Sequence, residues 1–221
     1  MLRLALGLLL LPATTLAEPR TYRIDAQESE LVALTRPDGL LGGLAHPHVV
    51  VARQVTGAVR FDAAAPEGAQ VEVSAPVAAL EVDEAPARLR HHLEKQVSAE
   101  DRKKIAEQMR SPGQLDAERF PTLTFSGRAV GRGPEGGLVL KGALTLHGVA
   151  VQVTLPVKVT VEGGRLVGVG SLELTHAMFG MKPVSLALGT IRNAEALRLE
   201  LRLVARDEAG GAAPSAPTLP P

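Results

Sequence analysis

Hydrophobic and polar residues alternate along most of this chain, and the alternation is clearest between Gly142 and Val157. In that stretch, apolar residues occupy nearly every second position on both sides of a His147-Gly148 step. A period of two is typical of strands that bury one face, and a short break between two such runs is typical of a hairpin. The stretch therefore predicts two paired antiparallel strands.

The same alternation recurs in segments on both sides of this hairpin. Apolar residues of one parity face polar residues of the other parity at residues 59–62, 70–74, 122–126, 138–146, 149–161, 166–174 and 197–203. Glycine and proline clusters at residues 65–68, 131–137 and 162–165 have the length of hairpin loops. Sequential antiparallel pairing follows from this order of strands and turns.

The predicted fold class is all-β, an extended antiparallel lipocalin-like β-barrel of about eight strands. Closing the sheet into a barrel removes its free edges and leaves an apolar lumen that can hold one ligand. A β-sandwich filled by its own side chains is the alternative, because alternation alone does not separate the two architectures.

Helical spacing interrupts the strands between residues 86 and 110, where Ile105 and Met109 stand four residues apart among charged side chains. Ser98 precedes acidic residues in the position of an N-cap. We expect one or two short inserted helices, packed over the sheet or one barrel mouth. Their basic residues are expected to form a solvated face, with transient contact with an anionic membrane surface as the alternative.

The two ends of the chain differ from the middle. Residues 1–17 combine Arg3, an apolar run and small residues before Glu18, which predicts a cleaved signal peptide and a periplasmic or secreted protein. The apolar run is shorter than the roughly 20 residues that span a bilayer. Residues 18–206 are predicted to form one domain, and residues 207–221, rich in Pro, Ala and Gly, a disordered tail.

Composition excludes several functions. The chain has no cysteine, so it has no disulfide and no thiolate metal site. Its 24 basic and 24 acidic residues give a formal net charge of +0, and aromatic residues make up only 2%. Nucleic acid is therefore not an expected partner, because neither a positive field nor stacking platforms are available.

The apolar parity gives the candidate lining of the lumen. An aliphatic wall suits a branched hydrocarbon better than a planar, hydrogen-bonding substrate. The ten residues predicted to contact a lipid in the lumen are Val59, Phe61, Val73, Leu123, Phe125, Leu140, Leu144, Val151, Leu172 and Leu199. For each of them, ordinary core packing is the alternative.

Three histidines, His46, His147 and His176, fall at ends of predicted strands, where a barrel can bring them to one rim. They are candidate contacts for a ligand headgroup, and structural hydrogen bonding is the alternative. Their spacing matches no compact metal motif, so no metal site is predicted. No catalytic motif is present in the predicted domain, and the protein is not expected to be an enzyme.

Several landmarks follow one another in a characteristic order. They are Tyr22-Arg23-Ile24-Asp25, the L-D-x-x-x-F-P-x-x-x-F pattern at residues 115–125, G-x-L-T-L-H-G-V at residues 142–149 and T-H-A-M-F-G-M at residues 175–181. Together they closely resemble the YceI-like family of polyisoprenoid-binding proteins, over residues 21–205. The resemblance implies a lipocalin-like barrel whose lumen holds a polyprenyl or isoprenoid-quinone chain in the periplasm, without catalysis or a covalent cofactor.

The sequence thus predicts a secreted or periplasmic protein that carries or stores an isoprenoid lipid. The alternative is a non-lipid envelope interaction protein, or a metal-binding one, on the same barrel with a filled interior. A homodimer is left open by the sequence.

Overall fold

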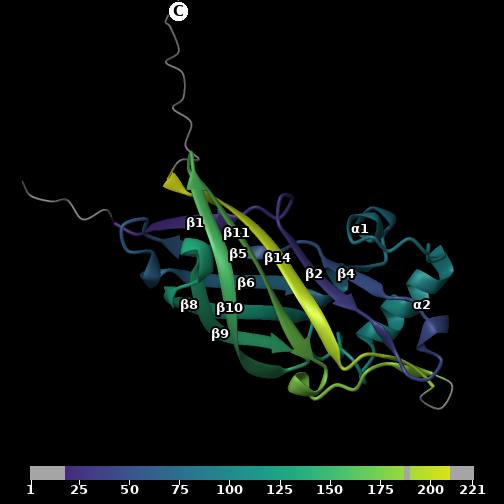
Figure 1. Cartoon of the computed structure of the whole chain (residues 1–221). Helices are drawn as coiled ribbons and strands as arrows, with labels where there is room; N and C mark the ends of the chain where they lie inside the picture. Colours follow the sequence, from purple (N-terminus) through teal and green to yellow (C-terminus); the bar gives the residue numbers. More distant parts are fainter. Residues whose placement is uncertain (1–17, 187–189, 210–221) are drawn as a thin grey trace, which may run out of the picture.

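A computed structural model describes residues 18–186 and 190–209 of the chain. Two helices, α1 (Ala85–Arg90) and α2 (Ala99–Arg110), accompany a structure made mainly of strands (Figure 1). The strands are β1 (Arg20–Ile24), β2 (Glu30–Thr35), β3 (Pro37–Asp38), β4 (His48–Ala52), β5 (Thr56–Phe61), β6 (Gln70–Pro76), β7 (Leu80–Val82), β8 (Thr122–Arg132), β9 (Leu138–Leu146), β10 (Val149–Glu162), β11 (Arg165–Thr175), β12 (Ser185–Leu186), β13 (Ile191–Asn193) and β14 (Ala196–Asp207).

Eight strands close into an antiparallel barrel in the order β1-β5-β6-β8-β9-β10-β11-β14. The barrel closes because β1 pairs with β5 on one side and with β14 on the other, where Tyr22 faces Asp207. This pairing confirms the predicted all-β barrel and excludes the open β-sandwich. Apolar side chains alternate inward along each long strand, so the barrel encloses one hydrophobic core.

A second set of strands extends the barrel at one end. The first half of β14 pairs with β2 rather than with β1, and β2 continues the sheet through β4 to β7. A small separate sheet is formed by β12, β13 and β3. Strand β14 therefore belongs to the closed barrel at its end and to the extension at its start.

The inserted helices lie beside this extension, at the end of the barrel away from β1 (Figure 1). Helix α1 places Ala87 against Val32, Val49 and Val51, which form the outer face of β2 and β4. Helix α2 begins after Ser98, whose side chain accepts a hydrogen bond from the Asp101 amide, as the sequence predicted. Among the described residues, no helix is long and apolar enough to cross a membrane.

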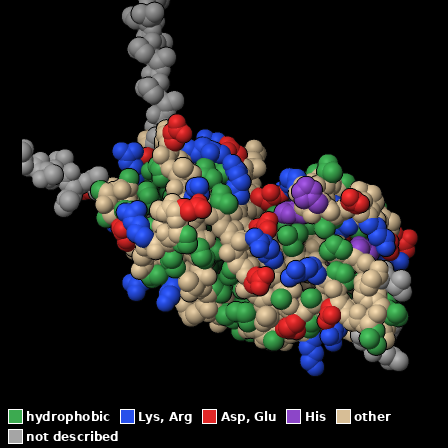
Figure 2. Space-filling model, in the orientation of Figure 1, with side chains coloured by type: hydrophobic (Ala, Val, Ile, Leu, Met, Phe, Trp, Pro, Cys, Tyr) green, Lys and Arg blue, Asp and Glu red, His purple; other side chains and the backbone are tan. Residues whose placement is uncertain are grey.

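Basic side chains of the helical segment mostly find partners within the protein. Arg102 pairs with Glu84, Lys104 with Glu100, and the Arg110 guanidinium donates to the backbone carbonyls of Ala78 and Leu80. Acidic and basic side chains are interspersed over the visible surface (Figure 2). Arg88 contradicts the prediction of a solvated face, because its side chain is only 1% exposed.

The predicted hairpin turn consists of His147 and Gly148 alone, between Leu146 and Val149. Both turn residues have positive φ angles, 50° and 70°, as a two-residue turn of type I′ requires.

At the other end of the barrel, β14 runs on to Asp207, which is buried and pairs with Arg20. Residues 207–209, the start of the predicted tail, are thus described with the barrel, whereas residues 1–17 and 210–221, on which the predicted signal peptide and the rest of the tail fall, lie outside the described residues.

Candidate binding site in the barrel lumen

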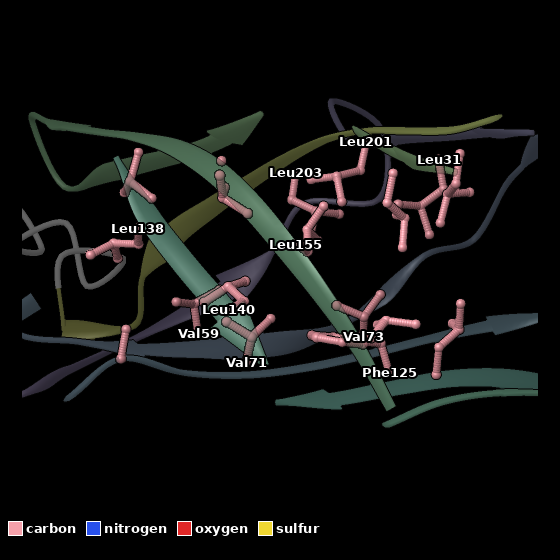
Figure 3. Close-up of a pocket in the computed structure, with 18 of the residues that line it drawn as sticks. Leu31, Val59, Val71, Val73, Phe125, Leu138, Leu140, Leu155, Leu201 and Leu203 are labelled. Carbon is pink, nitrogen blue, oxygen red and sulfur yellow. The ribbon is translucent and has the colours of Figure 1, made fainter. Parts of the chain in front are cut away.

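The barrel encloses a cavity of about 100 Å³ whose lining is entirely hydrophobic apart from Gly168. Side chains reach it from opposite walls (Figure 3). In that view Leu31, Leu201 and Leu203 project from one wall, and Val59, Val71 and Val73 project from the other. A space of this kind excludes charged and hydrogen-bonding ligands from its centre, because nothing there compensates their lost hydration.

Eight of the ten residues predicted to line the lumen do so: Val59, Phe61, Val73, Phe125, Leu140, Leu144, Leu172 and Leu199. The other two belong to the surrounding core. Leu123 packs against the main core cluster, and Val151 packs with the cluster around Phe179. Contact between these residues and a ligand stays a prediction.

Twelve further residues line the cavity without having been predicted, and several of them share the parity of the predicted ones. On β10, Val153, Leu155, Val157 and Val159 all line the cavity, and the period-two rule applied to the whole strand would have found them. Leu31 carries no such signal, because residues 31–34 are all apolar and do not alternate. The remaining missed residues are Ala69, Val71, Leu138, Leu166, Gly168, Leu201 and Leu203.

One end of the lumen is closed by the segment that follows β11. Phe179, which is fully buried, packs there with Leu174 and Val153. Two histidines hold this segment in place. The Nδ1–H of His147 donates to the carbonyl of Phe179 at 3.2 Å, and that of His176 donates to the carbonyl of Glu195 at 2.9 Å.

The third predicted histidine, His46, lies at the same end of the barrel but in another group of side chains. The strand register places the start of β4, the end of β11 and the β9–β10 hairpin at that end. His46 stacks edge-on against His48, with ring centroids 4.9 Å apart. All three histidines therefore lie at the same end of the barrel. His147 and His176 donate hydrogen bonds to the carbonyls of Phe179 and Glu195, whereas His46 packs beside the start of β4.

His48 also contacts the buried ion pair between Asp83 and Arg88. Its Nδ1–H donates to Asp83 Oδ2 at 2.6 Å, and Arg88 Nη1 donates to Asp83 Oδ1, also at 2.6 Å. The Val49 amide donates to the same carboxylate. Arg88 also donates to the carbonyls of Pro47 and Lys95, so it ties α1 and the loop after it to the start of β4.

The pKa values of this group follow from its surroundings. Burial by itself raises the pKa of Asp83, but hydrogen bonds from His48, Val49 and Arg88 outweigh burial and hold it below the ordinary aspartate value. Burial lowers the pKa of His46, and the neighbouring cations lower it further. Asp83 is therefore an anion at neutral pH and His46 is a neutral imidazole.

The site combines an apolar wall with few free polar atoms. Across residues 18–186 and 190–209, the structure contains no group of three or more His, Asp or Glu side chains arranged to hold a metal ion. At one end of the lumen, the Nδ1–H groups of His147 and His176 are held by structural hydrogen bonds. His46 Nε2, at the same end, is buried without a hydrogen-bond partner.

Comparison with known proteins gives one family and a set of similar folds. The model of the YceI-like domain matches residues 22–205. The crystal structure of BcnA from Burkholderia cenocepacia is similar with a TM-score of 0.62 and 20% identity, covering 82% of this chain and 99% of that one. The Campylobacter jejuni YCEI protein that crystallizes with large solvent channels has a TM-score of 0.50 and 12% identity, covering 72% and 84%. No curated protein matches.

Proposed function

This chain belongs to the YceI-like domain family, and we propose that it binds an isoprenoid lipid, of the polyprenyl or isoprenoid-quinone type, in the lumen of its barrel. The protein carries or stores this lipid in the periplasm or outside the cell. The signal-like pattern of residues 1–17 supports that location.

One observation carries the proposal: the side chains that line the lumen are all apolar. Strands β5, β6, β9, β10, β11 and β14 each contribute Val, Leu or Phe side chains to it. Burial of a hydrocarbon chain against such a wall contributes about 25 cal/mol per Å² of apolar surface. Branched methyl groups pack against Val and Leu side chains without leaving a polar atom unsatisfied.

The width of the lumen sets a condition on binding. The cavity of about 100 Å³ is smaller than the roughly 300–1,000 Å³ of pockets that enclose small molecules. A lipid chain therefore enters only as side chains such as Leu155 and Leu201 change rotamer and the barrel widens. Side chains in such walls do change rotamers, although the packing density of cores opposes large changes.

The deciding experiment is mass spectrometry of an organic extract of the protein purified from a host that makes isoprenoid lipids. We expect an isoprenoid at a fixed molar ratio to the protein after delipidated protein is incubated with host membranes and repurified. A protein that repeatedly yields no lipid under these conditions does not have the proposed function.

The same small volume favours a second candidate function, an envelope interaction protein whose barrel is a scaffold filled by its own side chains. This candidate predicts a protein that takes up no lipid and whose thermal melting is unchanged by added isoprenoids. Lipid-dependent stabilisation excludes it, because only a ligand that binds the native state raises the melting temperature.

A further inference from the structure

Exposed hydrophobic side chains gather at the end of the barrel that Phe179 closes. The described residues include eight large hydrophobic side chains that are exposed, and four of them belong to elements at this end. Val149 begins β10 beside the hairpin, and Met178 directly precedes Phe179. Leu40 and Leu41 follow β3. Single exposed hydrophobic residues are ordinary, but several at one end of a molecule are typical of an interaction surface.

Leu40 and Leu41 form the most exposed part of this surface. Leu40 is 93% exposed and Leu41 is 46% exposed. Strand β13 pairs with β3 just before them and is followed by β14, whose Ala196 lies opposite Thr175 at the end of β11. Because β11 leads into the closing segment, the small sheet and its leucine turn lie at the same end of the barrel as that segment.

The turn that carries the two leucines has a fixed backbone. Gly39 adopts a φ of 94°, which favours glycine, and the Gly42 amide donates to the Gly39 carbonyl at 3.0 Å. The Leu41 amide donates to the carbonyl of Thr190 at 2.9 Å. An apolar medium offers no partner to a free backbone amide, so a turn with paired amides enters a bilayer at lower cost than an open loop.

Charged side chains around the leucine turn favour an anionic partner. Within the small sheet, Arg192 pairs with Asp38 at 2.7 Å. Arg36 and Lys182 flank the sheet, are exposed and make no ion pair within the part of the chain that the structure describes. Against them stands the acid Glu195, so the small sheet and its flanks carry one net positive charge. Cations of this kind are attracted to the anionic lipids of a bilayer.

The size of the leucine turn favours a bilayer over a protein partner. A specific protein interface buries roughly 800 Å² on each partner, and two leucines on one turn supply only a small part of such an area. A bilayer needs no complementary surface, because apolar side chains enter the boundary between headgroups and hydrocarbon wherever they project far enough. The helical segment is not the expected contact, since Arg102 and Lys104 of α2 are paired within the protein.

We propose that Leu40 and Leu41 insert into the surface of an anionic lipid bilayer, with Arg36 and Lys182 at the level of the headgroups. This docking surface presents the Phe179 end of the barrel to the membrane. The inference goes beyond the proposed function, because it does not depend on what the lumen binds.

Insertion is tested with a single fluorescent reporter, because the chain contains no tryptophan. The emission of Leu40→Trp is expected to shift to shorter wavelength when vesicles of phosphatidylglycerol and phosphatidylcholine are added to the protein purified after export. The matched control is Val169→Trp, which changes a residue that is 47% exposed on the outer wall. Val169 stands about 20 Å before the end of β11, so no shift is expected there.

The two parts of the contact are separated by sedimentation with the same vesicles. The double variant Leu40→Ser/Leu41→Ser is expected to bind about ten-fold more weakly or less, because the burial of both leucine side chains is lost. The double variant Arg36→Gln/Lys182→Gln is expected to lose the preference for vesicles with phosphatidylglycerol over pure phosphatidylcholine. The control Val169→Ser is expected to bind like wild type.

Three outcomes overturn the inference. The first is the absence of both vesicle binding and an emission shift. The second is unchanged binding of the Leu40→Ser/Leu41→Ser variant, which places the contact elsewhere. The third is a dimer that forms without lipid in analytical ultracentrifugation and is abolished in that variant, which assigns the leucine turn to a second copy of the chain. None of them bears on lipid in the lumen, which the extraction experiment tests separately.

Discussion

The ring of Phe120 lies over Gly148, so close that a Cβ atom at residue 148 would stand 2.4 Å from Cε1 of the ring. The same ring meets His147 edge-on, with centroids 5.6 Å apart and an interplanar angle of 87°. Phe120 comes from the L-D-x-x-x-F-P segment, and Gly148 from the β9–β10 hairpin. The two most specific sequence landmarks are therefore the two sides of one contact.

This contact predicts that Gly148→Ala destabilises the protein by about 1–3 kcal/mol. Alanine at a φ of 70° is strained, and its methyl group also displaces the Phe120 ring. Urea denaturation measures the loss. The control is Gly163→Ala, at a φ of 55° with no atom within 4 Å of the added Cβ. Equal losses in the two variants would show that the ring contributes nothing.

The buried ion pair between Arg88 and Asp83 makes a second prediction. Arg88→Met leaves the Asp83 carboxylate buried without its cation, and we expect a loss of about 3–5 kcal/mol in the free energy of unfolding. Arg53→Met breaks the exposed pair with Glu81 and is expected to cost less than about 1 kcal/mol. Similar losses for both variants, by chemical denaturation, contradict the structure around Asp83.

Stability is expected to depend on pH through His46. Burial, and then the nearby side chains of His48, Lys95 and Arg88, lower the pKa of His46 below the ordinary histidine value of 6.5, with Asp83 opposing them. The unfolded chain therefore binds a proton at His46 more readily than the folded protein does. The His46 contribution is complete above pH 6.5 and is lost as pH falls from 6.5 toward the lowered pKa of the folded protein.

Denaturation series between pH 5 and 8 in wild type and His46→Leu measure this contribution. The variant is expected to show a flatter pH profile just below pH 6.5. Carboxylates with lowered pKa values, including Asp83 and Asp25, add stability above the ordinary aspartate pKa of 3.8 that is lost as pH falls below it, in both proteins. Identical profiles near pH 6 would falsify the burial of a neutral His46.

The lumen is tested by two neighbouring residues of β11 that face opposite ways. Gly168 lines the cavity, whereas Val169 is 47% exposed on the outer wall. Gly168→Leu fills the lumen and is expected to lower the amount of lipid bound per protein molecule, because overpacking closes the space that the chain occupies. Val169→Leu adds bulk outside and is expected to bind lipid like wild type. Mass spectrometry of extracts from both folded variants decides the point.

Much of the fold was predictable because it depends on local periodicity. The alternation on β9 and β10 identified the hairpin, and Ser98 marked the start of α2. Strand β2 was not predicted, although its Leu31 belongs to the lumen wall. Residues 31–34 are all apolar, so the strand lacks the period-two alternation that marks the others.

In the candidate site, too, the residues with a local sequence signal were predicted and those without one were not. Parity alone placed Leu140 and Leu144 on the lumen wall, and position at a strand end placed His147 and His176 at the rim. Parity did not exclude Leu123, because residues on one face of a strand can reach either the cavity or the core beside it. Arg88 was expected in solvent, since nothing near it in sequence indicates that Asp83 and β4 surround it.

The sequence by itself determined the long alternating strands, their inward faces and the apolar character of the lumen, because alternation is a property of each strand on its own. Only the tertiary structure decided the width of the cavity, the closure of β1 on β14 and the burial of Arg88 against Asp83. These features depend on contacts between segments far apart in the chain. No local pattern fixes such contacts, because side-chain packing across the barrel sets both its volume and the partners of its buried polar groups.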